Sequence, residues 1–161
     1  MECSFQCFYL GISSVFYLEK AFYFCTMNKK EITQLSYEIT GLAIKVHKEL
    51  GPGLLESVYE KCLKYELEQN GYKVFQQVPV PIEYGGIIIE SELRLDLLVE
   101  DKVIVELKTV DALLPIHEAQ LMTYMKLLKI PQGLLMNFYS YNLTKNTKPL
   151  VNQYFKCLPE R

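Results

Sequence analysis

The sequence predicts an α/β fold in which helices flank a mixed β-sheet, and three observations indicate this class. Apolar residues recur with helical spacing in some segments and as short strand-like runs in others. Glycine and proline separate these segments where helices and hairpins commonly end. The composition, with 50% hydrophobic and 22% charged residues among 161, is typical of a globular chain long enough to bury a core. The expected order is helix, helix, three strands, helix and strand.

Two amphipathic helices are expected first. Between residues 31 and 50, apolar residues recur every three or four positions, at Ile32, Leu35, Ile39, Leu42, Val46 and Leu50. Gly51-Pro52-Gly53 has the residue types that end a helix. A second helix, ending near Asn70-Gly71, has an inner face made by Leu55, Val58, Tyr59, Cys62, Leu63 and Leu67.

Three strands in a meander follow the helices. They are expected at residues 73–84, 87–99 and 103–109. Gly85-Gly86 predicts a tight hairpin between the first two strands. Pro79 and Pro81 cannot donate backbone hydrogen bonds, so the first strand is expected to be bent or to lie at an edge of the sheet.

The remaining sequence predicts a helix and one or two strands. The helix is expected at residues 116–129, with strands at 132–139 and 150–155. Pro115 near the start of this helix and Pro131 just beyond its end suit the two boundaries.

The third strand carries two charges although its other residues are those of a buried strand. Its sequence is Val103-Ile104-Val105-Glu106-Leu107-Lys108. Side chains alternate along a strand, so Glu106 and Lys108 share one face with Ile104. A carboxylate is costly to bury unless a metal ion or a partner charge compensates it. The strand therefore indicates either a catalytic centre or a buried Glu-Lys ion pair that holds the sheet together.

A second carboxylate is expected beside the first. If Glu100, Asp101 and Lys102 form a three-residue loop, Asp96 lies directly opposite Glu106 on one face of the sheet. A two-residue loop would place Asp96 on the other face. We favour the three-residue loop on chemical grounds, because two adjacent carboxylates are the hard oxygen ligands that Mg²⁺ or Mn²⁺ prefers.

The order of these residues resembles the PD-(D/E)XK nuclease core. Asp96 precedes Glu106-Leu107-Lys108 on the next strand, and Leu95 stands where the superfamily name has proline. The helix-strand-strand-strand-helix-strand order from Gly53 to Tyr139 resembles the restriction-endonuclease-like fold of that superfamily.

Two further motifs extend the resemblance. Gln120-x-x-x-Tyr124 is similar to a motif of the branch found in recombination helicase-nucleases. Gly53-x-x-Glu56-x-x-Tyr59 is similar to the signature of the small GxxExxY proteins. The resemblance covers residues 28–139.

The resemblance implies a metal site and a hydrolytic reaction. Asp96 and Glu106 would bind Mg²⁺ or Mn²⁺ together with the carbonyl of Leu107. Glu56 would be a further acidic ligand, directly or through water. Lys108 would position the attacking water. The expected reaction is the hydrolysis of a phosphodiester bond.

Other residues of the motifs have roles at the margin of this site. By the same resemblance, Gln120 and Tyr124 would steady Lys108 or contact the substrate backbone. Tyr59 is predicted to be a core aromatic residue rather than a reactive group.

The implied partner is nucleic acid, and we expect DNA rather than RNA. The formal net charge of −2 gives no basic surface for tight duplex binding. The alternative is therefore a non-cleaving module, built on a nuclease fold, that binds nucleic acid or protein. A homodimer or a protein that delivers the substrate is a candidate partner, and no stable membrane association is expected.

Residues 1–26 differ in kind from the rest. They are rich in aromatic residues, and Met27 stands directly before ordinary globular sequence. We expect residues 1–26 to be an upstream extension or an apolar segment without fixed structure, and residues 27–161 to form a single domain. Five cysteines, an odd number without repeated spacing, suit a reducing compartment, so a cytoplasmic location is expected.

Overall fold

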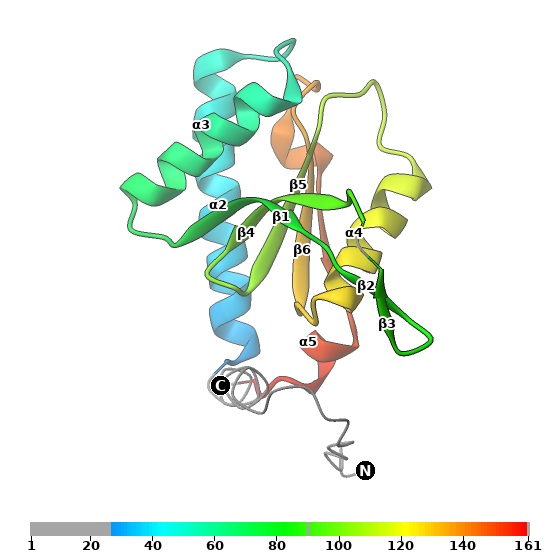
Figure 1. The fold of residues 1–161 in the computed structure, drawn as a ribbon. Coiled ribbons are helices and arrows are strands. Elements are labelled where there is room, and N and C mark those ends of the chain that lie inside the picture. Colours follow the sequence, from blue (N-terminus) through cyan, green and yellow to red (C-terminus); the bar gives the residue numbers. More distant parts are fainter. Residues whose placement is uncertain (1–26, 90, 161) are drawn as a thin grey trace.

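A five-stranded sheet with helices on both faces forms the centre of the computed structural model, which describes residues 27–89 and 91–160 (Figure 1). The expectation for residues 1–26 lies outside the described residues. The elements are α2 (Lys29–Leu50), α3 (Glu56–Gln69), β1 (Val74–Pro79), β2 (Ile82–Tyr84), β3 (Ile87–Ile89), β4 (Arg94–Val99), β5 (Val103–Lys108), α4 (Pro115–Leu127), β6 (Gln132–Asn137), η1 (Leu143–Asn146), β7 (Thr147–Val151) and α5 (Gln153–Cys157).

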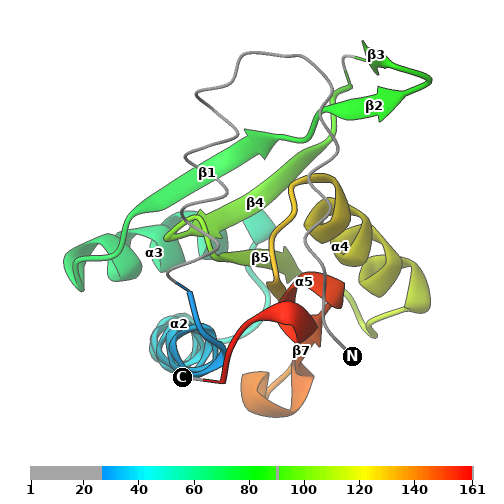
Figure 2. The ribbon, with the colours of Figure 1, turned by 90° about the horizontal axis from the view of Figure 1, so that it is seen from below.

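The main sheet is mixed, as predicted. Its strand order is β1-β4-β5-β6-β7. β5 and β6 are parallel, whereas the other neighbouring strands are antiparallel. One apolar core packs α2 and α3 against the sheet, and a second packs α4 against it (Figure 2). The predicted fold class, an α/β sheet flanked by helices, is confirmed.

Local signals explain the ends of α2. The side chain of Asn28 accepts a hydrogen bond from the backbone N–H of Glu31 at 2.9 Å, which caps the start of the helix. Gly51 ends it with a φ of 69°, a left-handed conformation that favours glycine, as the predicted stop signal requires.

The first two predicted strands are each divided in two. β1 ends at Pro79 and lies at an edge of the main sheet, as its prolines predict. β2 and β3 form a separate two-stranded sheet that stands apart from the main one (Figure 1). Gly85 and Gly86 connect them with φ values of 60° and 82°, so the predicted tight hairpin is confirmed.

The C-terminal prediction is partly wrong. The predicted strand at residues 150–155 is observed as β7, which ends at Val151, and the chain then turns into α5. Asn152 causes the change, because its side chain accepts hydrogen bonds from the backbone N–H groups of Tyr154 and Phe155.

Gly133 of β6 allows α4 to pack closely on the sheet. A Cβ atom at this position would lie 2.8 Å from Cδ1 of Leu121 and 2.9 Å from Sδ of Met125, and both side chains are fully buried. We expect Gly133→Ala to lower the free energy of unfolding by about 1–3 kcal/mol in urea titrations. Gly41→Ala in α2, where nothing lies within 4 Å, is the control and should keep or raise stability. Equal stability of both variants would contradict the close packing.

Candidate active site

The loop between β4 and β5 sets the register that the site requires. Val99 pairs with Val103 and Leu97 with Val105, so the loop has the predicted three residues. Glu100 and Asp101 both have a φ of 53°. Continued by one residue, this register leads from Leu97 and Val105 to Asp96 and Glu106, and Glu106 is a charge that acts on Asp96.

Asp96 is attached to the backbone of β5. The regular pairing of β4 with β5 ends at Leu97, and the Asp96 carboxylate continues the contact. Its Oδ2 accepts a hydrogen bond from the backbone N–H of Leu107 at 2.8 Å. The side chain is buried, with only 8% of the residue exposed. Asp96 therefore holds a fixed position beside the strand that carries Glu106 and Lys108.

Glu106 and Lys108 form an ion pair on the side of β5 that faces α4. Nζ of Lys108 donates a hydrogen bond to Oε1 of Glu106 at 2.8 Å. Glu106 is only 1% exposed, and its Oε2 has no hydrogen-bond partner among the described residues. Ile104 belongs to the core against α4, whereas Val103 and Val105 belong to the core against α2 and α3. The predicted alternation of faces is confirmed.

Glu56, the first residue of α3, lies outside the sheet and joins Asp96, Glu106 and Lys108 in one charged cluster. Its Oε1 lies 3.9 Å from Nζ of Lys108, and about a third of its side chain is exposed. The position at the first turn of a helix favours a carboxylate, because the helix dipole is positive there. The structure thus brings Glu56, Asp96, Glu106 and Lys108 together.

Tyr59 fixes the loop that precedes Glu56. Its hydroxyl donates a hydrogen bond to the carbonyl of Gly51 and accepts one from the backbone N–H of Leu54. Its ring is fully buried and stacks on Phe138 with centroids 4.6 Å apart. Tyr59 is therefore a core residue, as predicted, and its hydroxyl holds the turn from which Glu56 projects.

The cluster contains more negative than positive charge. Burial, followed by repulsion from Glu106, raises the pKa of Asp96 to about 7. Burial also raises the pKa of Glu106 and of Glu56, although Lys108 acts in the opposite direction on both. Burial opposes the charged form of Lys108, but Glu106 and Glu56 raise its pKa above the ordinary value. One ammonium group thus serves three carboxylates, and an added cation would stabilise their ionised form.

Gln120 and Tyr124 bind each other on α4. Nε2 of Gln120 donates a hydrogen bond to the Tyr124 hydroxyl at 2.9 Å, as their spacing of one helical turn allows. Tyr124 is buried in the core between α4 and the sheet. Among the described residues, neither side chain hydrogen bonds to Lys108, so their link to the cluster remains a prediction.

Two polar residues of this region were absent from the predicted set. Nε2 of Gln77 donates to Oε1 of Glu60 at 2.8 Å and lies 3.5 Å from Oδ1 of Asp96. Glu60 follows Glu56 by one helical turn, and this spacing was the available signal. Gln77 carries no such signal, because its place beside Asp96 depends on the pairing of β1 with β4.

The donor set suits a hard divalent cation with few protein ligands. In residues 27–89 and 91–160, no group of three or more His, Cys, Asp and Glu side chains is arranged to hold a metal ion. Mg²⁺ commonly takes one or two carboxylates and completes its shell with water. Asp96 and Glu106 would meet this need, and Oε2 of Glu106, which has no partner in the described part of the chain, is an oxygen that a cation would satisfy.

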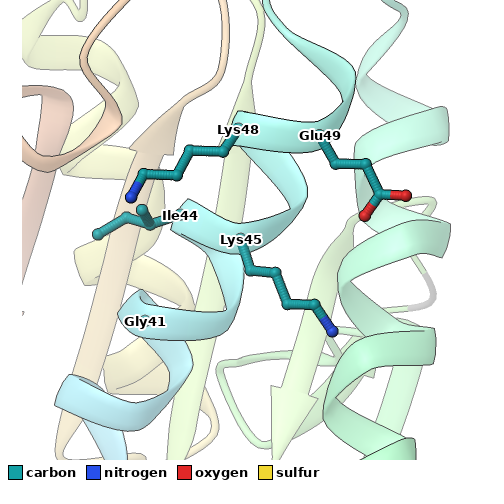
Figure 3. Close-up of a pocket in the computed structure, with 5 residues that line it drawn as sticks. All are labelled: Gly41, Ile44, Lys45, Lys48 and Glu49. Carbon is teal, nitrogen blue, oxygen red and sulfur yellow. The ribbon is translucent and has the colours of Figure 1, made fainter.

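A hollow of about 460 Å³ lies on α2 and contains none of these residues (Figure 3). It is lined by Gly41, Ile44, Lys45, Lys48 and Glu49. Lys45 is paired with Glu66 of α3 at 2.7 Å, and Figure 3 shows Lys48 and Glu49 pointing in different directions. These side chains do not converge on a common point, so the hollow is not a second candidate site.

None of the helices in the described ranges is both long and apolar enough to cross a membrane.

Comparison with known proteins identifies the family. Residues 33–149 match the model of the PD-(D/E)XK nuclease superfamily. No curated protein and no solved structure matches the chain. The matched range contains all the candidate residues, namely Glu56, Asp96, Glu106, Lys108, Gln120 and Tyr124. Because this range is most of the sequence and the fold has the expected mixed sheet, the chain belongs to the PD-(D/E)XK nuclease superfamily.

Proposed function

We propose that this protein is a Mg²⁺- or Mn²⁺-dependent nuclease that hydrolyses phosphodiester bonds in nucleic acid, in DNA rather than RNA. The observation that carries the proposal is the buried cluster in which Asp96, Glu106 and Lys108 meet on two adjacent strands. Membership of the PD-(D/E)XK superfamily supports the same reaction.

Asp96 and Glu106 would hold the cation, with the Leu107 carbonyl as a further ligand. Glu56 would take part directly or through a water molecule. A bound divalent ion would supply Lewis-acid activation of the phosphate and of the attacking water. The contact of Asp96 with the Leu107 N–H and the contact of Glu106 with Lys108 keep both carboxylates oriented before the ion arrives.

Lys108 would act on the water and on the phosphate. Its ammonium group is held by Glu106 at 2.8 Å and is mostly buried, so it can orient a water molecule for in-line attack. The water oxygen would form a bond to phosphorus while the bond to the leaving oxygen breaks, and the proton that the water loses would reach the leaving oxygen through solvent. The positive charge of Lys108 offsets the negative charge that develops on the phosphate oxygens.

Gln120 and Tyr124 would steady Lys108 or contact the substrate backbone from α4. Because Tyr124 is buried in the core, a contact with substrate would be made by Gln120, which Tyr124 holds through its hydroxyl. We also propose that the chain belongs to the GxxExxY group. The spacing of Gly53, Glu56 and Tyr59 supports this, and Tyr59 holds the loop that presents Glu56. We further propose a cytoplasmic location, which the odd number of cysteines supports.

The second candidate function is a non-cleaving binding module. The formal net charge of −2 favours it, since a nuclease that works alone benefits from a basic surface. The same charge is compatible with a nuclease that forms a homodimer or receives its substrate from a protein partner.

A cleavage assay tests the proposal. The protein is incubated with single- and double-stranded DNA and RNA in Mg²⁺ or Mn²⁺. We expect metal-dependent cleavage that Asp96→Ala and Lys108→Ala abolish. Asp101→Ala and Lys102→Ala, in the loop at the other end of β5, are the matched controls and should retain activity. Cleavage unchanged in Asp96→Ala and Lys108→Ala would reject the assigned site. Absence of both cleavage and Mn²⁺ binding would favour the module.

A further inference from the structure

The edge strand β1 is irregular at one residue, and that residue lies opposite Asp96. Gln76 pairs with Leu97 and Val78 pairs with Leu95, so the register is the same on both sides of Gln77. Gln77 itself has a φ of 52°, in the left-handed region that residues other than glycine rarely adopt. A strained conformation of this kind persists only where surrounding contacts maintain it, and such positions gather at functional sites.

Three contacts maintain the conformation of Gln77. Its backbone carbonyl accepts a hydrogen bond from Nη1 of Arg94 at 3.0 Å. Its side-chain Nε2 donates to Oε1 of Glu60 at 2.8 Å and lies 3.5 Å from Oδ1 of Asp96. An amide nitrogen carries two hydrogens, so one can bind each carboxylate. The strained backbone thus places one amide between Glu60 and Asp96.

The two contacts of this amide differ in strength. The contact with Glu60 has the length of a good hydrogen bond, whereas the contact with Asp96 is long and weak. Glu60 is only 4% exposed, so its position is fixed by α3. Glu60 therefore anchors Gln77, and Gln77 supports Oδ1 of Asp96 without binding it tightly. The other oxygen, Oδ2, is already held by the Leu107 N–H.

We propose that Gln77 is a positioning residue, anchored by Glu60, that holds the Asp96 carboxylate in the orientation in which it binds a divalent cation. This inference rests on the proposed metal site. It assigns a role to the left-handed residue in β1 and to a buried carboxylate of α3 that the proposed reaction does not otherwise use. The weak contact with Oδ1 suits this role, because a cation can take that oxygen while the amide stays on Glu60.

The first test measures Mn²⁺ binding rather than activity. MnCl₂ is titrated into the full-length, metal-free protein, with binding followed by calorimetry and by the Mn²⁺ paramagnetic resonance signal. We expect Gln77→Leu to weaken Mn²⁺ binding by about 10-fold, the size of effect that outer-shell partners of metal ligands commonly have. Gln76→Leu makes the same change in the regular part of the same strand, so Mn²⁺ binding should be unchanged.

A glycine variant separates positioning from structural support. Gln77→Gly removes the amide but suits the positive φ, so its melting temperature should be close to that of the wild type or higher. Its Mn²⁺ affinity should nevertheless fall as it does in Gln77→Leu. If both Gln77 variants bind Mn²⁺ like the wild type, the proposal is overturned. A fall in melting temperature with unchanged Mn²⁺ affinity overturns it too, because that result describes a structural residue.

A double-variant cycle tests the anchoring role of Glu60. If Glu60 acts through Gln77, Glu60→Leu weakens Mn²⁺ binding, and combining it with Gln77→Leu causes no further loss. Additive losses contradict the anchoring. Failure of the proposed function gives a different result, since the wild-type protein would then bind no Mn²⁺. That outcome overturns both proposals, whereas equal binding by wild type and variants overturns only this one.

Discussion

Replacing Glu106 with glutamine is expected to lower cleavage by a factor of about 100 or more while leaving the protein folded. The change is isosteric and removes one charge. Under the proposed function, activity falls because the carboxylate that faces both Asp96 and Lys108 would be lost as a metal ligand. The cleavage rates of the variant and the wild type are compared on the same nucleic-acid substrate at saturating Mn²⁺.

Although Glu106→Gln lowers activity, it is not expected to lower the stability of the metal-free protein. In the metal-free protein, Glu106 is a buried carboxylate, one oxygen of which has no hydrogen-bond partner within residues 27–89 and 91–160, and it shares Lys108 with Glu56 and Asp96. The glutamine oxygen can still accept the Lys108 hydrogen bond, and one source of repulsion disappears. We therefore expect an unchanged or higher melting temperature without metal. Glu66→Gln, which alters the Glu66–Lys45 pair between α3 and α2, is the control and should keep full activity. A large loss of melting temperature in Glu106→Gln would favour a purely structural ion pair.

The second large effect is a fall in stability of the metal-free protein as the pH rises from about 4 to about 7. The pKa of Asp96 is raised to about 7 in the folded state, from an ordinary value of 3.8. The folded protein therefore keeps a proton that the unfolded chain releases in this range. The stabilisation is complete below the unfolded pKa and is lost as the pH passes the folded pKa. For one group shifted this far, the loss is on the order of a few kcal/mol.

Urea denaturation in EDTA at several pH values measures this effect. The raised pKa values of Glu56 and Glu106 act in the same direction as that of Asp96. Asp96→Asn cannot lose the proton, so its stability should depend less on pH than that of the wild type between about pH 4 and 7. Adding Mn²⁺ at neutral pH should restore stability to the wild type, because a ligand that binds only the folded state stabilises it. Parallel pH profiles for wild type and Asp96→Asn would contradict the buried position of this carboxylate.

The part of the site on β4 and β5 could be predicted because the chemistry of the two carboxylates favoured one of the two possible pairings of these strands. The turn between β4 and β5 has no Gly or Asn that would predict its type, and Glu100 and Asp101 adopt positive φ values that their residue types do not predict. Only the requirement that Asp96 meet Glu106 favoured the three-residue loop. By contrast, the alternation of Glu106 and Lys108 with Val105 and Leu107 followed directly from the geometry of a strand.

Other features depended on tertiary contacts that a sequence pattern does not contain. Gln77 meets Asp96 across strands that the β2–β3 hairpin separates along the chain, so no local spacing connects the two residues. The sequence does not predict the start of α5 although Asn152 is a typical helix cap, because the apolar residues around it also suit a strand. The first predicted strand is divided because β1 ends at Pro79, whereas a proline in a strand predicts a bend or an edge as readily as an end.

The position of β1 at the edge of the sheet affects how readily solvent reaches the cluster of Asp96, Glu106 and Lys108. β5 has hydrogen-bonded neighbours on both sides, whereas β1, as far as the described residues go, pairs with β4 alone. Backbone amide hydrogens of β1 should therefore exchange with solvent through local fluctuations, whereas those of β5 should exchange only when the whole sheet unfolds. β5, which bears Glu106 and Lys108, is therefore expected to be the more stable of the two strands. Detachment of β1 would expose one side of Asp96 while the centre of the sheet stays folded.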